Sequence, residues 1–190
     1  MPGQGYRDIA LLKSQGIRNL TATEQARHES YQGLPHPRLF FTQDDVEALK
    51  EKINSSIPAR NIWGMIYRDA LTTLRQPWPG YPTQDGDFLV RARDGYWKME
   101  RLSFAYLITD NVAFAQGAKE VLLDIVSWPR WTEPSFDDFE PRPWIGVLTT
   151  AELTRGVAIA YDWLYDVLTE GERAQIRSAL LKKGIIPLYL

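Results

Sequence analysis

The chain of 190 residues contains no cysteine and only two histidines, His28 and His36. The missing cysteine excludes disulfides and thiolate metal sites. No zinc spacing, Gly-rich phosphate loop or nucleophile elbow occurs, so the sequence predicts no metal and no cofactor. No apolar run approaches the roughly 20 residues needed to span a bilayer. The opening stretch MPGQGYRDIALLKSQ lacks the apolar core of a secretory signal, which leaves the localisation unknown.

Acidic and basic residues are nearly balanced in number. The 24 acidic and 22 basic residues leave a net charge of −2, so bulk charge predicts neither nucleic acid nor an anionic membrane as a partner. Aromatic residues are abundant instead: seven Trp, nine Tyr and seven Phe. A large helical core explains them most simply. Carbohydrate binding is the sharper alternative, because sugar rings stack on aromatic faces.

Helical periodicity accounts for most of the chain after a polar N-terminal arm at residues 1–33. Two capping pairs mark helix starts, Thr42 with Asp45 and Thr169 with Glu172. No segment alternates as a strand does, so the sequence predicts an all-α fold for residues 34–190. The predicted helices cover 43–53, 58–74, 88–108, 112–126, 147–168 and a last one that ends at Gly184.

The apolar positions of these helices repeat in pairs. The helices at 88–108 and 147–168 are apolar over most of their circumference, whereas the helix that follows each of them is largely charged on one side. Tight turns join each buried helix to its one-sided neighbour, which predicts antiparallel hairpins. Repetition of inner and outer helices predicts two concentric layers, as in an incomplete (α/α) toroid or a curved solenoid.

Three local patterns carry further predictions. In the helix at 58–74, one stripe holds Ile62, Ile66, Ala70 and Leu74. Gly95 is a candidate break in the helix at 88–108. Gly156 lacks a side chain, which would make room for the indole of Trp163.

The stretch AIAYDWLYDVL places two acids in an otherwise apolar helix. The helical wheel puts Asp162 and Asp166 on a narrow polar strip with Arg155, which predicts a charge network among them. The aromatic residues of the stretch fall on the packing arc or its flank. We therefore interpret the stretch as packing, and we predict a catalytic role for neither His28 nor His36.

Three segments together resemble the N-terminal helical domain of the heparinase II/III-like polysaccharide lyases. They are HPRLFFTQDDVEALKEKI, FAYLITDNVAFAQGAKEVLLDIVSW and TTAELTRGVAIAYDWLYDVLTEGERAQIRSALLKKGI. The resemblance covers about residues 35 to 190 and is strongest in the last segment. It implies that residues 34–190 are the N-terminal part of an (α/α) toroid that ends early, with the remaining toroid helices and a β-sandwich domain missing.

The family cleaves uronic-acid polysaccharides by β-elimination. Its members use Tyr and His as acid and base, and they neutralise the uronate carboxylate with Asn or His. Those residues lie C-terminal to the YDWLY helix, so the resemblance assigns no catalytic residue here and implies that this chain alone is inactive. It also implies a secreted or periplasmic protein whose partner is an acidic polysaccharide.

Aromatic loops supply the candidate substrate-binding residues. In the proline-rich loop WPRWTEPSFDDFEPRPWIG, Arg142 can pair with a carboxylate or sulfate, and Trp131 and Trp144 can stack on sugars. A second group would form the other wall of a cleft: Trp78, Tyr81, Tyr96 and Trp97.

Two alternative functions stay open. Asp137 or Asp138, with Glu140 nearby, could act as paired acids in a toroidal glycoside hydrolase. The chain could also be a non-enzymatic α-helical scaffold that binds a protein partner.

Overall fold

The computed structural model describes residues 33–83, 87–135 and 147–189. Across these ranges the chain is helical without a strand, which confirms the predicted all-α class. The elements are α3 (Gln43–Ser55), α4 (Ile57–Arg75), α5 (Phe88–Thr109), α6 (Val112–Ser127), α7 (Leu148–Trp163), η3 (Tyr165–Val167), α8 (Glu170–Ala179), η4 (Leu180–Ile185) and α9 (Ile186–Tyr189). The predicted arm lies outside these ranges except for Gly33. Among the described helices, none has the length and apolar character that a membrane crossing requires.

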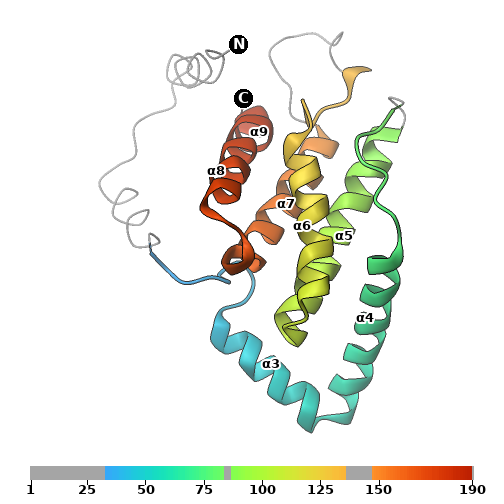
Figure 1. Cartoon of the computed structure of the whole chain (residues 1–190), viewed down its shortest axis with the longest axis vertical. Coiled ribbons are helices and arrows are strands. Elements are labelled where there is room, and N and C mark those ends of the chain that lie inside the picture. The colour runs from blue at the N-terminus through green and yellow to red at the C-terminus, as the bar shows by residue number, and fades with distance from the viewer. Residues whose placement is uncertain (1–32, 84–86, 136–146, 190) are drawn as a thin grey trace.

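The helices stand as two antiparallel hairpins beside α4 (Figure 1). One hairpin is α5 with α6 and the other is α7 with α8, as the sequence predicts. Helix α5 packs against α7, α6 and α4, so it lies at the centre of the array. Helix α3 crosses the lower end and leads directly into α4 (Figure 1).

Side-chain caps fix where these helices begin. Thr42 and Asp45 form the predicted capping box of α3, with the Thr42 amide 2.9 Å from Asp45 Oδ2. Thr169 and Glu172 form the capping box of α8, with the Thr169 amide 2.8 Å from Glu172 Oε2. Each box satisfies amides that have no partner inside the helix, which confirms both predicted starts.

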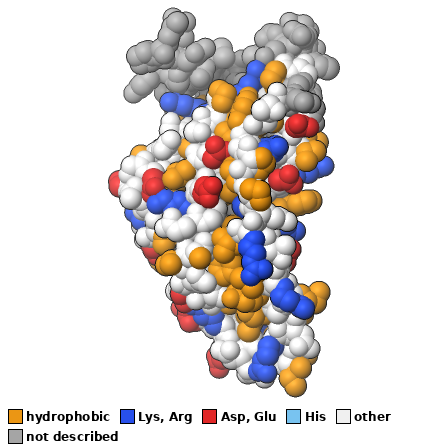
Figure 2. Space-filling view, turned by 45° about the vertical axis from the view of Figure 1, so that its right-hand side comes forward, with side chains coloured by type: hydrophobic (Ala, Val, Ile, Leu, Met, Phe, Trp, Pro, Cys, Tyr) orange, Lys and Arg blue, Asp and Glu red, His pale blue; other side chains and the backbone are white. Residues whose placement is uncertain are grey.

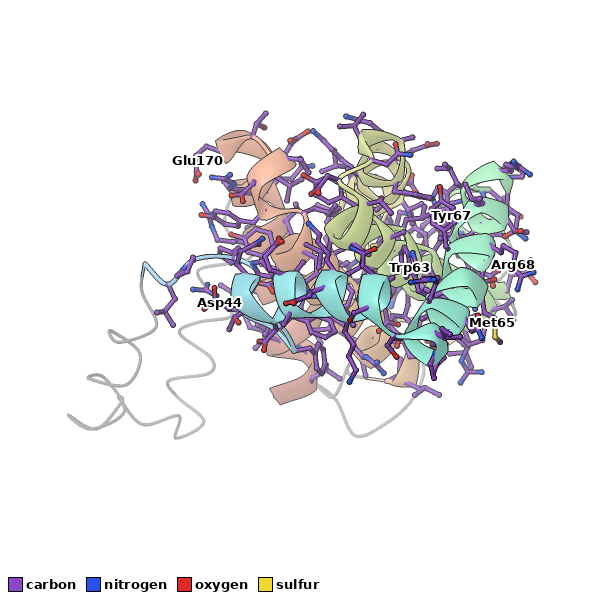
Figure 3. The ribbon with its side chains drawn as sticks, turned by 90° about the horizontal axis from the view of Figure 1, so that it is seen from below. Asp44, Trp63, Met65, Tyr67, Arg68 and Glu170 are labelled. Carbon is purple, nitrogen blue, oxygen red and sulfur yellow. The ribbon has the colours of Figure 1, made fainter. Side chains whose placement is uncertain are left out.

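The predicted stripe of helix α4 is buried only toward its C-terminal end. Ile62 is 60% exposed, whereas Ala70, on the same stripe, is fully buried and Leu74 packs against the core. The inward side carries Trp63 and Tyr67 (Figure 3). Their rings pack edge-on against Phe104 and Phe114 respectively. Two large aromatic rings remove more apolar surface from water than isoleucines do, so the helix turns them toward the core.

The glycines serve close packing rather than breaks. Helix α5 continues through Gly95, where a Cβ atom would lie 2.6 Å from Ile125 Cδ1 and 3.0 Å from the Trp78 ring. Contrary to the prediction, Gly156 on α7 does not make room for Trp163. Its missing Cβ would lie 3.0 Å from the Cα atom of Tyr96, so this glycine lets α7 approach the backbone of α5.

Two predicted helix ends are wrong. Helix α7 stops at Trp163 rather than Leu168, and η3 follows as a short 3-10 turn. The last helical segment runs past Gly184 to Tyr189, partly with π-helical geometry. Gly184 is buried against Thr154 and Trp131, so packing rather than helix termination requires glycine at this position.

Gly156→Ala should destabilise the protein by about 1–3 kcal/mol, because the new methyl group would push against the α5 backbone. Gly64→Ala is the matched control, since a Cβ there meets nothing within 4 Å. It should stabilise α4 by roughly 0.5–1 kcal/mol, through lower chain entropy in the unfolded state. Urea unfolding measures both changes, and equal stabilisation by the two variants would contradict the close approach of α7 to α5.

Candidate functional site

Two of the hollows that the described residues form lie at opposite ends of helix α5. The first, the Trp97 hollow, has a volume of about 260 Å³ and lies where α4 ends beside α5. Its lining includes Gln76, Trp78, Asp94, Trp97, Lys98 and Arg101. The second, the His36 hollow, has a volume of about 310 Å³ and lies at the other end of α5, beside the end of α7.

An exposed indole forms one wall of the Trp97 hollow. Trp97 lies on the outer side of α5 with 46% of its surface exposed. The Arg101 guanidinium sits one turn further along, 5.6 Å from the Trp97 ring centroid, and its Nε atom pairs with Asp69 at 2.8 Å. The ion pair holds the guanidinium beside the ring, so an aromatic face and a positive charge occur together.

A second indole that lines the Trp97 hollow is held in place by a carboxylate. Trp78 donates its Nε1–H to Asp124 Oδ2 at 2.8 Å, and its ring stacks nearly parallel to Trp128 at 6.3 Å. Trp128 donates to the same carboxylate oxygen at 2.9 Å. One carboxylate therefore orients both indoles, and Trp78 keeps a defined position although it lies in a loop.

A buried ammonium group also lines the Trp97 hollow. Lys98 Nζ donates to the carbonyl oxygens of Thr73 at 2.7 Å and Gln76 at 2.5 Å. Those carbonyls belong to the end of α4, where helix geometry leaves oxygens without partners. Burial lowers the pKa of Lys98, while the nearby Glu120 carboxylate opposes the shift. The lining of the Trp97 hollow thus includes Lys98, Arg101 and Asp94, and Asp69 pairs with Arg101, so two positive and two negative side chains meet there.

Some of the predicted binding residues line the Trp97 hollow, and others are buried in the core. Trp78 and Trp97 share one hollow, whereas Tyr81 is not among its lining residues and packs edge-on to Trp128. Trp131 is 1% exposed and donates to the Ile125 carbonyl at 3.0 Å, so its ring has no free face for a sugar. Tyr96 is buried under the Arg155 guanidinium. Burial, followed by the Glu100 carboxylate, raises the pKa of Tyr96 to about 12.

The remaining candidates belong to the proline-rich loop. Arg142 and Trp144 lie outside the described residues, as do the paired acids Asp137, Asp138 and Glu140. The described part of that loop ends at Ser135; its Trp128, Trp131 and Thr132 are buried, whereas Pro129, Pro134 and Ser135 are exposed.

A buried carboxylate in the His36 hollow binds the segment that precedes α3, residues 36–41, which we call the entry segment. No sequence pattern predicted this contact. Asp162, only 2% exposed, accepts a 2.5 Å hydrogen bond from His36 Nδ1. Its other oxygen accepts from the backbone amides of Arg38 and Leu39, each at 2.8 Å. The predicted network of Asp162 with Arg155 is wrong, because Arg155 instead lies 3.6 Å from Glu100 on α5.

Aromatic contacts hold the same entry segment in place. The His36 ring stacks on Tyr165 at 3.7 Å with an interplanar angle of 10°. The opposite end of the segment is tied by Trp163, which donates to the Leu39 carbonyl at 3.0 Å and packs against Phe41. His36 and Asp162 are 126 positions apart, so no local sequence pattern can predict their pairing. The sequence shows only that Asp162 is an acid in an otherwise apolar helix.

Within the ranges that the structure describes, no group of three or more His, Asp or Glu side chains could hold a metal ion. Comparison with family models and with curated proteins finds no match to this chain. The assignment of a function therefore rests on the two hollows and on the resemblance carried by the three sequence segments.

Asp162→Ala should lower the free energy of unfolding by about 3–5 kcal/mol, because it leaves a buried imidazole and two amides without their acceptor. Asp166→Ala is the control, since Asp166 is exposed and has no hydrogen bond or ion pair among the described residues. It should change stability by less than about 0.5 kcal/mol. Similar losses for both variants in urea unfolding would contradict a specific role for Asp162.

Proposed function

We propose that this chain is part of a polysaccharide lyase that acts on uronic-acid-containing glycans by β-elimination. The described residues would contribute a glycan-binding wall at the Trp97 hollow. The observation that carries the proposal is the exposed Trp97 ring with the Arg101 guanidinium held beside it, 5.6 Å from the ring centroid. The resemblance of the three sequence segments to this lyase family supports the same substrate class.

The chemistry of the hollow fits an acidic sugar. The C–H face of a sugar ring can stack on an indole, while Arg101 pairs with a carboxylate or sulfate. Asp94 and the Gln76 side chain can bind the hydroxyl groups that surround such a face. Trp78, oriented by Asp124, supplies a second aromatic surface. Stacking and charge pairing thus act on adjacent parts of one ligand.

The proposal assigns binding, but not catalysis, to this hollow. β-Elimination requires a neutralised uronate carboxylate and a base within about 3 Å of the C5 proton. Arg101 can contribute to neutralisation, but the described residues that line the Trp97 hollow include no histidine or tyrosine that could act as a base. The family's acid and base would come from further toroid helices and the β-sandwich domain.

The helix arrangement supports a toroid as the scaffold. In both hairpins, a helix apolar over most of its circumference precedes one with a charged outer side, and the two inner helices α5 and α7 pack together. Stacked hairpins of this kind build curved double layers. We propose that the described helices are consecutive units of an incomplete (α/α) toroid, in a secreted or periplasmic protein.

A non-enzymatic scaffold is the second candidate, and one observation favours it. The outward face of α4 exposes apolar side chains, among them Ile62 and Met65 at 60% and 64%. Figure 3 shows Met65 and Arg68 pointing away from the helix array, and Figure 2 shows hydrophobic side chains gathered beside Lys and Arg on this side of the molecule. Large exposed apolar patches are typical of protein-binding surfaces.

Titration with alginate and heparin oligosaccharides, followed by tryptophan fluorescence, separates the two candidates. We expect binding, and Trp97→Ala should weaken it about tenfold, equal to about 1.4 kcal/mol. Val90→Ala is the control, because Val90 is an exposed residue of the same helix outside the hollow. No fluorescence change with either glycan would favour the scaffold function.

A second prediction concerns activity. Because the resemblance places the acid and base C-terminal to the YDWLY helix, this chain alone should form no unsaturated product from alginate or heparin. The product's near-ultraviolet absorbance provides the assay, with an active polysaccharide lyase as the positive control. Rapid product formation by the 190-residue chain would contradict the assignment of binding without catalysis.

A further inference from the structure

A third hollow, the α4–α6 hollow, adjoins the Trp97 hollow. It has a volume of about 560 Å³, and its lining comes from the end of α4, the loop that follows it, α5 and α6. Four residues line both hollows: Gln76, Pro77, Trp78 and Lys98. A ligand longer than the Trp97 hollow can therefore continue into the α4–α6 hollow along these shared residues.

An arginine in the α4–α6 hollow is free to pair with a ligand. Arg75 is the last residue of α4, and its side chain is exposed. Among the described residues, its guanidinium has no hydrogen bond or ion pair. The planar guanidinium suits carboxylate and sulfate groups, because its N–H donors can bind two oxygens at once.

Lys98 places a second cation among the residues that the two hollows share. It is 9% exposed, and the carbonyls of Thr73 and Gln76 accept two of its hydrogen bonds. An ammonium group has three N–H donors, so one of them remains for a ligand. Because the two carbonyls hold the ammonium in place, this charge has a fixed position at the end of α4.

The remaining charged groups of the α4–α6 hollow leave it positive. Its lining also contains Lys119 and Glu120, and Lys119 is already paired with Glu172 at 2.8 Å. Arg75 and Lys98 then face one carboxylate, that of Glu120, which is a surplus of one positive charge. Glu120 and the nearby Gln116 amide can form hydrogen bonds with sugar hydroxyl groups.

From this continuity we propose that the glycan site spans both hollows, so that it takes an acidic oligosaccharide rather than one or two sugars. One acidic group would pair with Arg101 beside Trp97, and a later one with Arg75. The Trp97 hollow, at about 260 Å³, is smaller than common ligand pockets of roughly 300–1,000 Å³, whereas the α4–α6 hollow lies within that range. The inference rests on the proposed glycan binding and adds the length of the ligand to it.

A disaccharide and a hexasaccharide of alginate test the inference, with NMR of the isotope-labelled chain as the readout. The indole N–H of Trp97 reports on the first hollow, and the backbone amide of Gly117 reports on the α4–α6 hollow. We expect the hexasaccharide to shift both signals and to bind about tenfold more tightly than the disaccharide, because its second contact is intramolecular. The disaccharide should shift the Trp97 signal alone. The amide of Gly64, which lines neither hollow, should respond to neither ligand.

Arg75→Gln should weaken hexasaccharide binding about fivefold and leave disaccharide binding unchanged, because only the longer chain reaches Arg75. Arg68→Gln is the control, since it removes an exposed arginine of the same helix that lines neither hollow.

Three outcomes would overturn this inference alone: equal affinity for the two ligands, no shift of the Gly117 signal with the hexasaccharide, or no effect of Arg75→Gln on hexasaccharide binding. If neither ligand shifts the Trp97 signal, the proposed glycan binding fails, and the extended site fails with it.

Discussion

The close contact of α5 with α7 is the constraint on which the rest of the structure depends. It exists because Gly156 has no side chain: a Cβ atom placed there would lie 3.0 Å from the Cα atom of Tyr96. Helix α5 carries residues of both hollows, from Asp94 in one to Tyr106 in the other. Helix α7 contributes Asp162, which ties down the entry segment. A shift between the two helices would alter both hollows at once.

Two lysines donate hydrogen bonds to backbone carbonyls at the C-terminal ends of helices. Lys98 donates to carbonyls at the end of α4, and Lys183 donates to the carbonyls of Val126 and Trp128 at the end of α6. Burial lowers the pKa of both ammonium groups, yet helix C-terminal carbonyls are the groups that favour a cation there. In the first case, the same lysine also lines the Trp97 hollow, so a side chain that the helix end requires is part of a surface site.

Local signals in the sequence predicted most of the helices, but they did not predict the contacts that form the His36 hollow. The caps at Thr42 and Thr169 act over three residues, and they located helix starts correctly. The pairing of His36 with Asp162 joins the entry segment to the end of α7, and no periodicity encodes it. Gly95 failed as a predicted break for a related reason: the side chains that fill its space, Ile125 and Trp78, come from other elements.

For the candidate binding residues too, local patterns identified the residues, but contacts between distant elements decide their exposure. Trp78 lies in a proline-rich loop and Trp97 follows Gly95, so local patterns drew attention to both, and the structure brings them to one hollow. Trp131 and Tyr96 had equally suggestive neighbours in the sequence, but both are buried. Whether an aromatic ring faces water or the core depends on residues from other helices, which no local pattern specifies.

Native-state hydrogen exchange tests most directly whether the α5–α7 contact organises this protein. Amides in the middle of α5 and α7 should exchange only through global unfolding, with the same free energy as urea unfolding gives. Amides of α3, and those of Arg38 and Leu39 bonded to Asp162, should exchange through smaller openings. Exchange of the α5 and α7 amides at a lower free energy than those of α6 would contradict a central role for this contact.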